Sequence, residues 1–190
     1  MATGDVLIKT GTIIVLADTT DHAPGATAQN NLGTRTDQID LTSLANASYR
    51  QSAKFDFGGG TALWAPDWAV TAAIEPVSAP AATLAATLWV GFSESATAGQ
   101  DNPGNLTGAD ADYFGYGTVN TDADEAISQL IRIGAVTSTA DADIFVGNVG
   151  IIRPTARYGI VVVKNSYGVA LAADAIEMSI RISPLIPQAQ

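Results

Sequence analysis

The sequence predicts an all-β fold, an antiparallel sandwich or barrel formed by one domain of residues 1–190. In most segments with a readable pattern, hydrophobic residues alternate with polar ones, as in half-buried strands. Turns rich in glycine, proline and asparagine separate these segments. The length of 190 residues suits a single hydrophobic core, and no long proline- or serine-rich linker divides the chain.

The clearest strand lies near the C-terminus, over residues 176–182. Its even-numbered residues are apolar and its odd-numbered residues are polar, and Pro184 is expected to end it. The tail after Pro184 carries no strand signal. Similar patterns predict strands at 6–10, 12–17, 38–41, 53–57, 68–75, 84–92, 130–136, 144–152 and 158–164. Many short strands separated by turns are typical of a sandwich or a barrel.

Only one segment has a helical pattern, a short helix near residues 121–130. Thr121 and Asp124 match a capping pattern, and apolar residues follow at helical spacing. The alternative is an irregular acidic loop that leads directly into the strand beginning at Leu130.

Composition excludes several classes of function. Nineteen acidic residues against nine basic ones give a net charge of -10, which argues against a nucleic-acid partner. No basic residue lies between Lys54 and Arg132. The chain has no cysteine and one histidine, so thiolate sites are excluded, and a serine triad or a multi-histidine zinc site has almost no residues to form from.

A glycosidase would need two facing carboxylates, but the spacing of the four glutamates brings no two of them together. Glu75 and Glu177 fall on the polar faces of strands, where a solvated surface explains them. We therefore expect no enzymatic activity and no catalytic residues.

Acidic residues in the glycine-rich loops are candidates for binding calcium, with Asp110 and Asp112 as the named ligands. They do not reproduce an EF-hand, because the third oxygen ligand and the glycine of that loop are missing. The alternative is that these acids cap backbone N–H groups in turns. No other cofactor is expected.

Three tryptophans, Trp64, Trp68 and Trp89, are candidates for stacking against sugar rings. Trp89 lies out of phase with its apolar neighbours, so its side chain should point to the opposite face of its strand. That orientation indicates an interface or a second buried layer. The alternative for all three is a place in the core.

Neither secretion nor membrane insertion is expected. The N-terminal segment has an acid, Asp5, where a secretory signal needs positive charge. The longest apolar stretch, 149–163, is interrupted by Arg153, Pro154 and Arg157, so it is too short to cross a membrane.

Three segments, 95–113, 157–165 and 175–184, resemble small virion structural proteins of tailed bacteriophages. The likeness rests on glycine turns such as Gly99 to Gly108 and on strand alternation such as Ile176 to Ile182. It implies a jelly-roll-like β-sandwich of the kind found in tail fibres, fibre adaptors and capsid decoration proteins. It implies no catalytic residues.

We therefore expect a non-catalytic structural protein of a phage virion, assembled in the host bacterial cytoplasm and attached to the tail as a fibre or fibre-adaptor component. Its expected partners are other virion proteins and further copies of itself, most simply in a trimer. Residues 1–5 and 184–190 would be arms between subunits. Two alternatives stay open: a capsid decoration protein, and a carbohydrate-binding module that recognises a glycan of the host surface.

Overall fold

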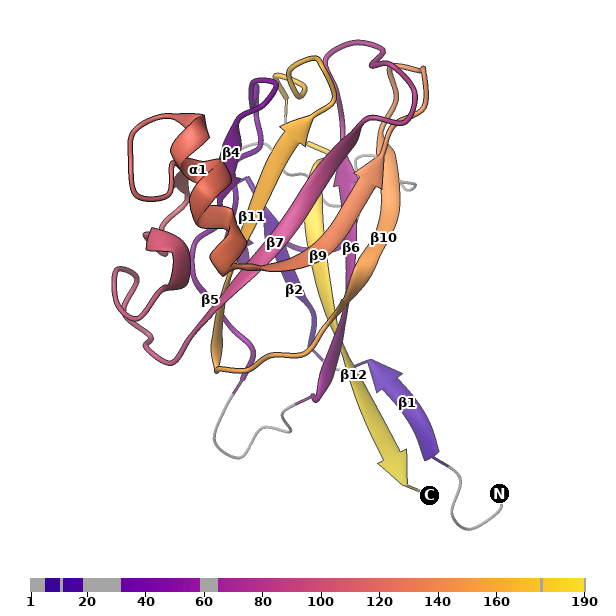
Figure 1. Ribbon diagram of the computed structural model, residues 1–190. Helices are drawn as coiled ribbons and strands as arrows, with labels where there is room; N and C mark the ends of the chain where they lie inside the picture. Colours follow the sequence, from indigo (N-terminus) through magenta and orange to yellow (C-terminus); the bar gives the residue numbers. More distant parts are fainter. Residues whose placement is uncertain (1–5, 11, 19–31, 59–64, 175, 190) are drawn as a thin grey trace.

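Two β-sheets face each other across a common core in the computed structural model, which describes residues 6–10, 12–18, 32–58, 65–174 and 176–189. The first sheet has the order β10 (Phe145–Ile152), β6 (Asp67–Ile74), β12 (Ser179–Ala189), β2 (Ile14–Ala17) and β3 (Asp37–Gln38), with β1 (Val6–Thr10) paired to β12. The second has the order β8 (Ala111–Asp112), β4 (Tyr49–Gln51), β11 (Tyr158–Ser166), β7 (Ala85–Ser93) and β9 (Ile131–Thr137), with β5 (Phe55–Asp56) paired to β11. The all-β sandwich predicted from the sequence is confirmed (Figure 1).

The strand order is that of a jelly roll. Along the chain β2 pairs with β12, β4 with β11, β6 with β10 and β7 with β9, so the eight main strands form one nested antiparallel hairpin. This hairpin is folded over, which lets β12 pair with β6 and β11 pair with β7. The resulting two four-strand arrays are the jelly-roll arrangement that the resemblance implied. The pairs are antiparallel except for the two-residue contact of β2 with β3.

Alternation within the strands builds the core. In β6 the side chains of Trp68, Val70, Ala72 and Ile74 point inward, and all four are buried. Leu88 and Val90 of β7 face them from the second sheet in the same buried cluster. The period of two in the sequence therefore decides which side of each strand meets the other sheet.

One side of the sandwich is closed by two edge strands, β9 of the second sheet and β10 of the first, which run side by side (Figure 1). Their backbones approach so closely that a Cβ atom on Gly134 would lie 2.0 Å from the carbonyl oxygen of Val149. Glycine is needed here because any side chain would separate the two sheets.

The insertion between β7 and β9, residues 94–130, covers the outer face of the second sheet. It holds a 3-10 turn (Pro103–Asn105), strand β8, the helix α1 (Asn120–Ala126) and a second 3-10 turn (Ile127–Gln129). Helix α1 begins at Asn120 and its cap residue is Val119, two residues before the predicted cap Thr121. The reason is that the Asp122 carboxylate accepts the backbone N–H groups of Thr118 and Val119, which makes Val119 the cap residue.

Beneath α1 lies a second buried cluster, separate from the main core. Its members come from β4, β11 and the insertion: Tyr49, Leu106, Tyr113, Ala123, Ala126, Leu130, Ile160 and Val162. Within the described part of the chain, the sandwich therefore has a third layer on the side of the second sheet.

The sequence predicted that Pro184 would end strand β12. In the structure β12 continues through Pro184 to Ala189. Its second half, Leu185–Ala189, pairs with β1 and extends away from the sandwich as a two-stranded ribbon (Figure 1). Residues 184–189 of the predicted C-terminal arm are therefore part of this strand, whereas residues 1–5 of the predicted N-terminal arm lie outside the described residues.

Candidate functional site

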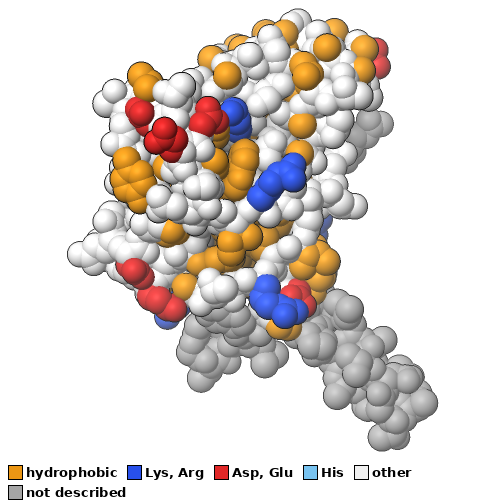
Figure 2. Space-filling view, viewed as in Figure 1, with side chains coloured by type: hydrophobic (Ala, Val, Ile, Leu, Met, Phe, Trp, Pro, Cys, Tyr) orange, Lys and Arg blue, Asp and Glu red, His pale blue; other side chains and the backbone are white. Residues whose placement is uncertain are grey.

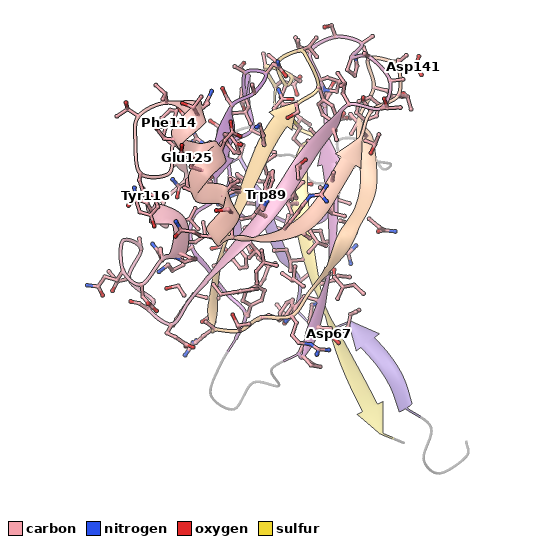
Figure 3. The ribbon with its side chains drawn as sticks, viewed as in Figure 1. Asp67, Trp89, Phe114, Tyr116, Glu125 and Asp141 are labelled. Carbon is pink, nitrogen blue, oxygen red and sulfur yellow. The ribbon has the colours of Figure 1, made fainter. Side chains whose placement is uncertain are left out.

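The structure describes two of the three tryptophans that were candidates for sugar stacking, and these two lie in different buried clusters. Trp68 is only 4% exposed; it packs edge-on against Phe57 in the core and donates its indole N–H to the carbonyl oxygen of Ala65. Trp89 points to the opposite face of its strand, as predicted, and is half-buried beneath the insertion, with its ring centroid 6.3 Å from that of Tyr49 (Figure 3). Trp64 lies outside the described residues.

The calcium candidates Asp110 and Asp112 lie close together, but an arginine lies between them. The Asp110 carboxylate accepts the Arg50 Nε–H group at 2.7 Å, and Asp112 accepts an Nη1–H group at 3.3 Å. Asp110 also accepts the backbone N–H of Asp40. Among the described residues no three acidic or histidine side chains are grouped as metal ligands. These acids instead connect β8 and the loop after β3 to β4.

Beside this ion pair the surface has a hollow of about 270 Å³, which we name the polar hollow. It lies between β4, β8, the loop 40–45 and the start of α1. The residues of the polar hollow that bear on its chemistry are Asp40, Ser43, Arg50, Asp112, Phe114 and Asn120. The structure thus brings together residues separated by up to eighty positions, and of these only Asp112 was a candidate from the sequence.

Several polar groups around the polar hollow have no partner among the described residues. The Asn120 side chain donates to the Ser48 hydroxyl, while its Oδ1 atom is buried and accepts no hydrogen bond. Exchanging the oxygen and nitrogen of this amide would leave the nitrogen unpaired instead. Arg50 uses two of its five N–H donors in the bonds to Asp110 and Asp112. The Asn120 oxygen is enclosed, so the polar groups that the hollow presents to solvent are those of Arg50 and Asp112.

The charge on Arg50 is firmly held. Burial disfavours the charged guanidinium, but the hydrogen bonds to Asp110 and Asp112 outweigh this, so the pKa of Arg50 lies above its usual value. One arginine against the three aspartates Asp40, Asp110 and Asp112 leaves this part of the surface net negative. Anionic ligands are therefore disfavoured here.

A second charged group fixes α1 to the sheet. The Asp124 carboxylate accepts hydrogen bonds from the Lys164 ammonium, at 2.6 Å, and from the Tyr49 hydroxyl. The Lys164 ammonium also lies 4.7 Å from the centroid of the Tyr49 ring. The bonds from Lys164 and then from Tyr49 lower the pKa of Asp124. Both bonds end on the Oδ1 atom of Asp124, and they join α1 to β4 and β11.

The loop after β7, residues 94–101, is held by several side-chain hydrogen bonds, and Lys54 makes the most of them. The Lys54 ammonium lies within hydrogen-bonding distance of four oxygen atoms of β7 and this loop: Ser93 Oγ at 2.9 Å and the carbonyl oxygens of Ser95 at 2.9 Å, Thr97 at 2.8 Å and Gln100 at 3.0 Å. This is the arrangement expected around a bound cation, but here the cation belongs to the chain itself. Nothing in the local sequence of Lys54 indicated this role.

The polar hollow could not be predicted from the sequence, because its residues come from four separate segments that share no motif. The one available signal was the pair Asp110 and Asp112, which the sequence offered as calcium ligands; in the structure both carboxylates form ion pairs with Arg50. Figure 2 shows acidic side chains gathered near α1 and the few basic side chains well apart from one another on this face.

Comparison with protein-family models, with curated proteins and with solved structures finds no match for this chain. In the part of the chain that the structure describes, no helix combines the length and the hydrophobicity needed to cross a membrane.

Proposed function

We propose that this chain is a non-catalytic structural subunit of a tailed-phage virion, attached to the tail as a fibre or fibre-adaptor component and associated with further copies of itself. The jelly roll supports the proposal, because viral capsid domains use this fold. Lectin domains and cupins use it too, so the fold alone does not assign a function. The observation that carries the proposal is the ribbon of β1 and the end of β12.

An isolated two-stranded ribbon is only marginally stable in water. The ribbon extends beyond the sheet, and among the described residues β1 pairs with β12 alone. Strand β6 stops pairing with β12 at Leu185, so the rest of β12 has no second neighbour in the described chain. A further strand on either edge would stabilise this ribbon.

Hydrogen bonds of β2 decide which backbone groups of the ribbon face outward. Val15 exchanges hydrogen bonds with Thr36, on the side of β2 away from β12. Its neighbours Ile14 and Leu16 therefore face β12, where they oppose Ile182 and Ile180. It follows that the even-numbered residues of β12 direct their N–H groups toward β2 and β1, and the odd-numbered residues direct theirs the other way.

This alternation places both prolines of β12 where they remove no hydrogen bond of the sheet. The last residue of β12 that pairs with β2 is Ile182, and the first that pairs with β1 is Leu185. Pro184 lies between them, where no strand is paired on its N–H side. Pro187 faces the free edge of β12, beyond the last residue of β6. A proline on a free edge opposes the addition of another strand, so this edge is protected.

The free edge of β1 has no such protection. Lys9 and Leu7 oppose Ile186 and Gln188 and pair with them, so the backbone N–H of Ile8 points outward. We infer that a second copy of the chain adds a strand along this edge. Association through β1 would make the ribbon the subunit-connecting arm of the particle.

Two proline substitutions test this assignment in the full-length protein. Ile8→Pro removes an outward N–H on the β1 edge, whereas Ala189→Pro removes an outward N–H on the β12 edge. Sedimentation velocity should give an oligomer for the parent, with a trimer at three times the chain mass of 19.5 kDa. Ile8→Pro should sediment as a monomer with an unchanged thermal midpoint, and Ala189→Pro should behave as the parent. A parent that is a stable monomer, or equal effects of both substitutions, would overturn the assignment.

The place of the chain in the particle is tested separately. Gold-labelled antibody against the chain, viewed on purified virions by electron microscopy, should decorate the tail. Labelling over the capsid lattice would instead assign the chain as a decoration protein, and absence of label from particles would refute both.

A further inference from the structure

We propose that the polar hollow binds a single neutral sugar ring of the hexose type. This inference goes beyond the structural role and does not depend on self-association. It rests on three features of the polar hollow: partly exposed polar groups that can donate and accept, an aromatic wall, and a net negative charge.

A hexose presents hydroxyl groups that each donate and accept, so its site must supply both kinds of partner. Asp112 contributes one carboxylate oxygen to Arg50, and its side chain is 59% exposed, which leaves the second oxygen accessible. Arg50 supplies the remaining N–H donors.

The apolar side of a sugar ring needs a flat apolar surface. Phe114, half-buried in the insertion beside α1, lines the polar hollow together with Leu44 (Figure 3). Aromatic rings commonly stack on the C–H face of a ring-shaped ligand. This places the aromatic wall on a residue other than the three tryptophans considered from the sequence.

Charge and size narrow the ligand further. Two aspartates, Asp40 and Asp112, line the polar hollow with one arginine, and this net negative charge disfavours acidic sugars and phosphates. The volume of about 270 Å³ lies just below the range of roughly 300–1,000 Å³ typical of sites for drug-sized ligands. One sugar ring therefore fits, and a longer oligosaccharide would extend out of the polar hollow beyond its first sugar unit.

Saturation-transfer difference NMR on the full-length protein tests the proposal. The probes are the methyl glycosides of glucose, galactose and mannose, with glucuronic acid as the acidic counterpart. At least one neutral glycoside should show transfer at millimolar concentration, and glucuronic acid should show less. Phe114→Ala should weaken that binding about tenfold through loss of the stacked ring.

The matched control is Tyr116→Ala, in the same insertion. Tyr116 is 66% exposed and does not line the polar hollow, so its replacement should leave binding unchanged. Far-UV circular dichroism and thermal midpoints of both variants verify that they are folded. The proposal is wrong if none of the neutral glycosides shows transfer, if both variants bind as the parent does, or if glucuronic acid binds best.

Discussion

Replacing Lys54 with methionine should release the loop 94–101 from the sandwich. An ammonium has three N–H donors, and four oxygen atoms lie 2.8–3.0 Å from the Lys54 nitrogen, so three charge-assisted bonds can form at once. Such bonds contribute about 1.5–3 kcal/mol each when fully protected. The carbonyl groups of the loop lie at exposed positions, where water replaces the lost donor. We therefore expect the free energy of unfolding to fall by only about 2–3 kcal/mol.

Urea unfolding of Lys54→Met measures this change, and amide hydrogen exchange shows where it acts. Exchange should accelerate in the loop 94–101 and stay unchanged in the central strands β7 and β11. The control is Arg132→Met, which removes an exposed positive charge and should change stability by less than about 0.5 kcal/mol. If the two variants were equally stable and exchange in the loop were unaltered, Lys54 would not be what holds the loop.

Two further predictions concern the closed side of the sandwich and the attachment of α1. Gly134→Ala should lower the free energy of unfolding, measured in urea, by about 3 kcal/mol or more, because the new Cβ atom would lie 2.0 Å from the Val149 carbonyl oxygen. The control is Gly147→Ala, whose Cβ atom would lie 3.7 Å from the nearest atom and which should lower the free energy of unfolding by less than about 1 kcal/mol. Because the pKa of Asp124 is lowered from 3.8, its carboxylate stabilises the fold above about pH 4 and loses this effect as the pH falls further. Asp124→Asn should thus be less stable than the parent by up to about 1 kcal/mol at pH 6, and the difference should shrink as the pH falls below about 4; a difference that stays constant as the pH falls would contradict this.

The sequence predicted the main strands well because each has one face in the core, so burial imposes a period of two. The strand at 84–92, for example, appears as Ala85–Ser93. It predicted the opposite orientation of Trp89 for the same reason. Strands β4 and β8 were missed, since they have three and two residues and no pattern can develop over such lengths. The course of β12 past Pro184 was missed because the cost of a proline depends on whether a strand lies on its N–H side.

The candidate site was not predictable in the same way. The polar hollow forms where β4, the insertion and the loop 40–45 meet, and only the folded chain brings Arg50 next to Asp110 and Asp112. Local sequence shows the acids but not the arginine that neutralises them, and this is why a calcium site was considered. The role of Lys54 is hidden for a similar reason, since three of its four acceptors are backbone carbonyl groups, which are independent of residue type.

The most direct test of the central claim is a cryo-electron microscopy map of the native assembly formed by the full-length chain. Backbone density from a neighbouring copy should run along the free edge of β1, about 4.8 Å away, as in a continuous sheet. A map in which this edge faces solvent in every copy, with subunits joined through another surface, would contradict it.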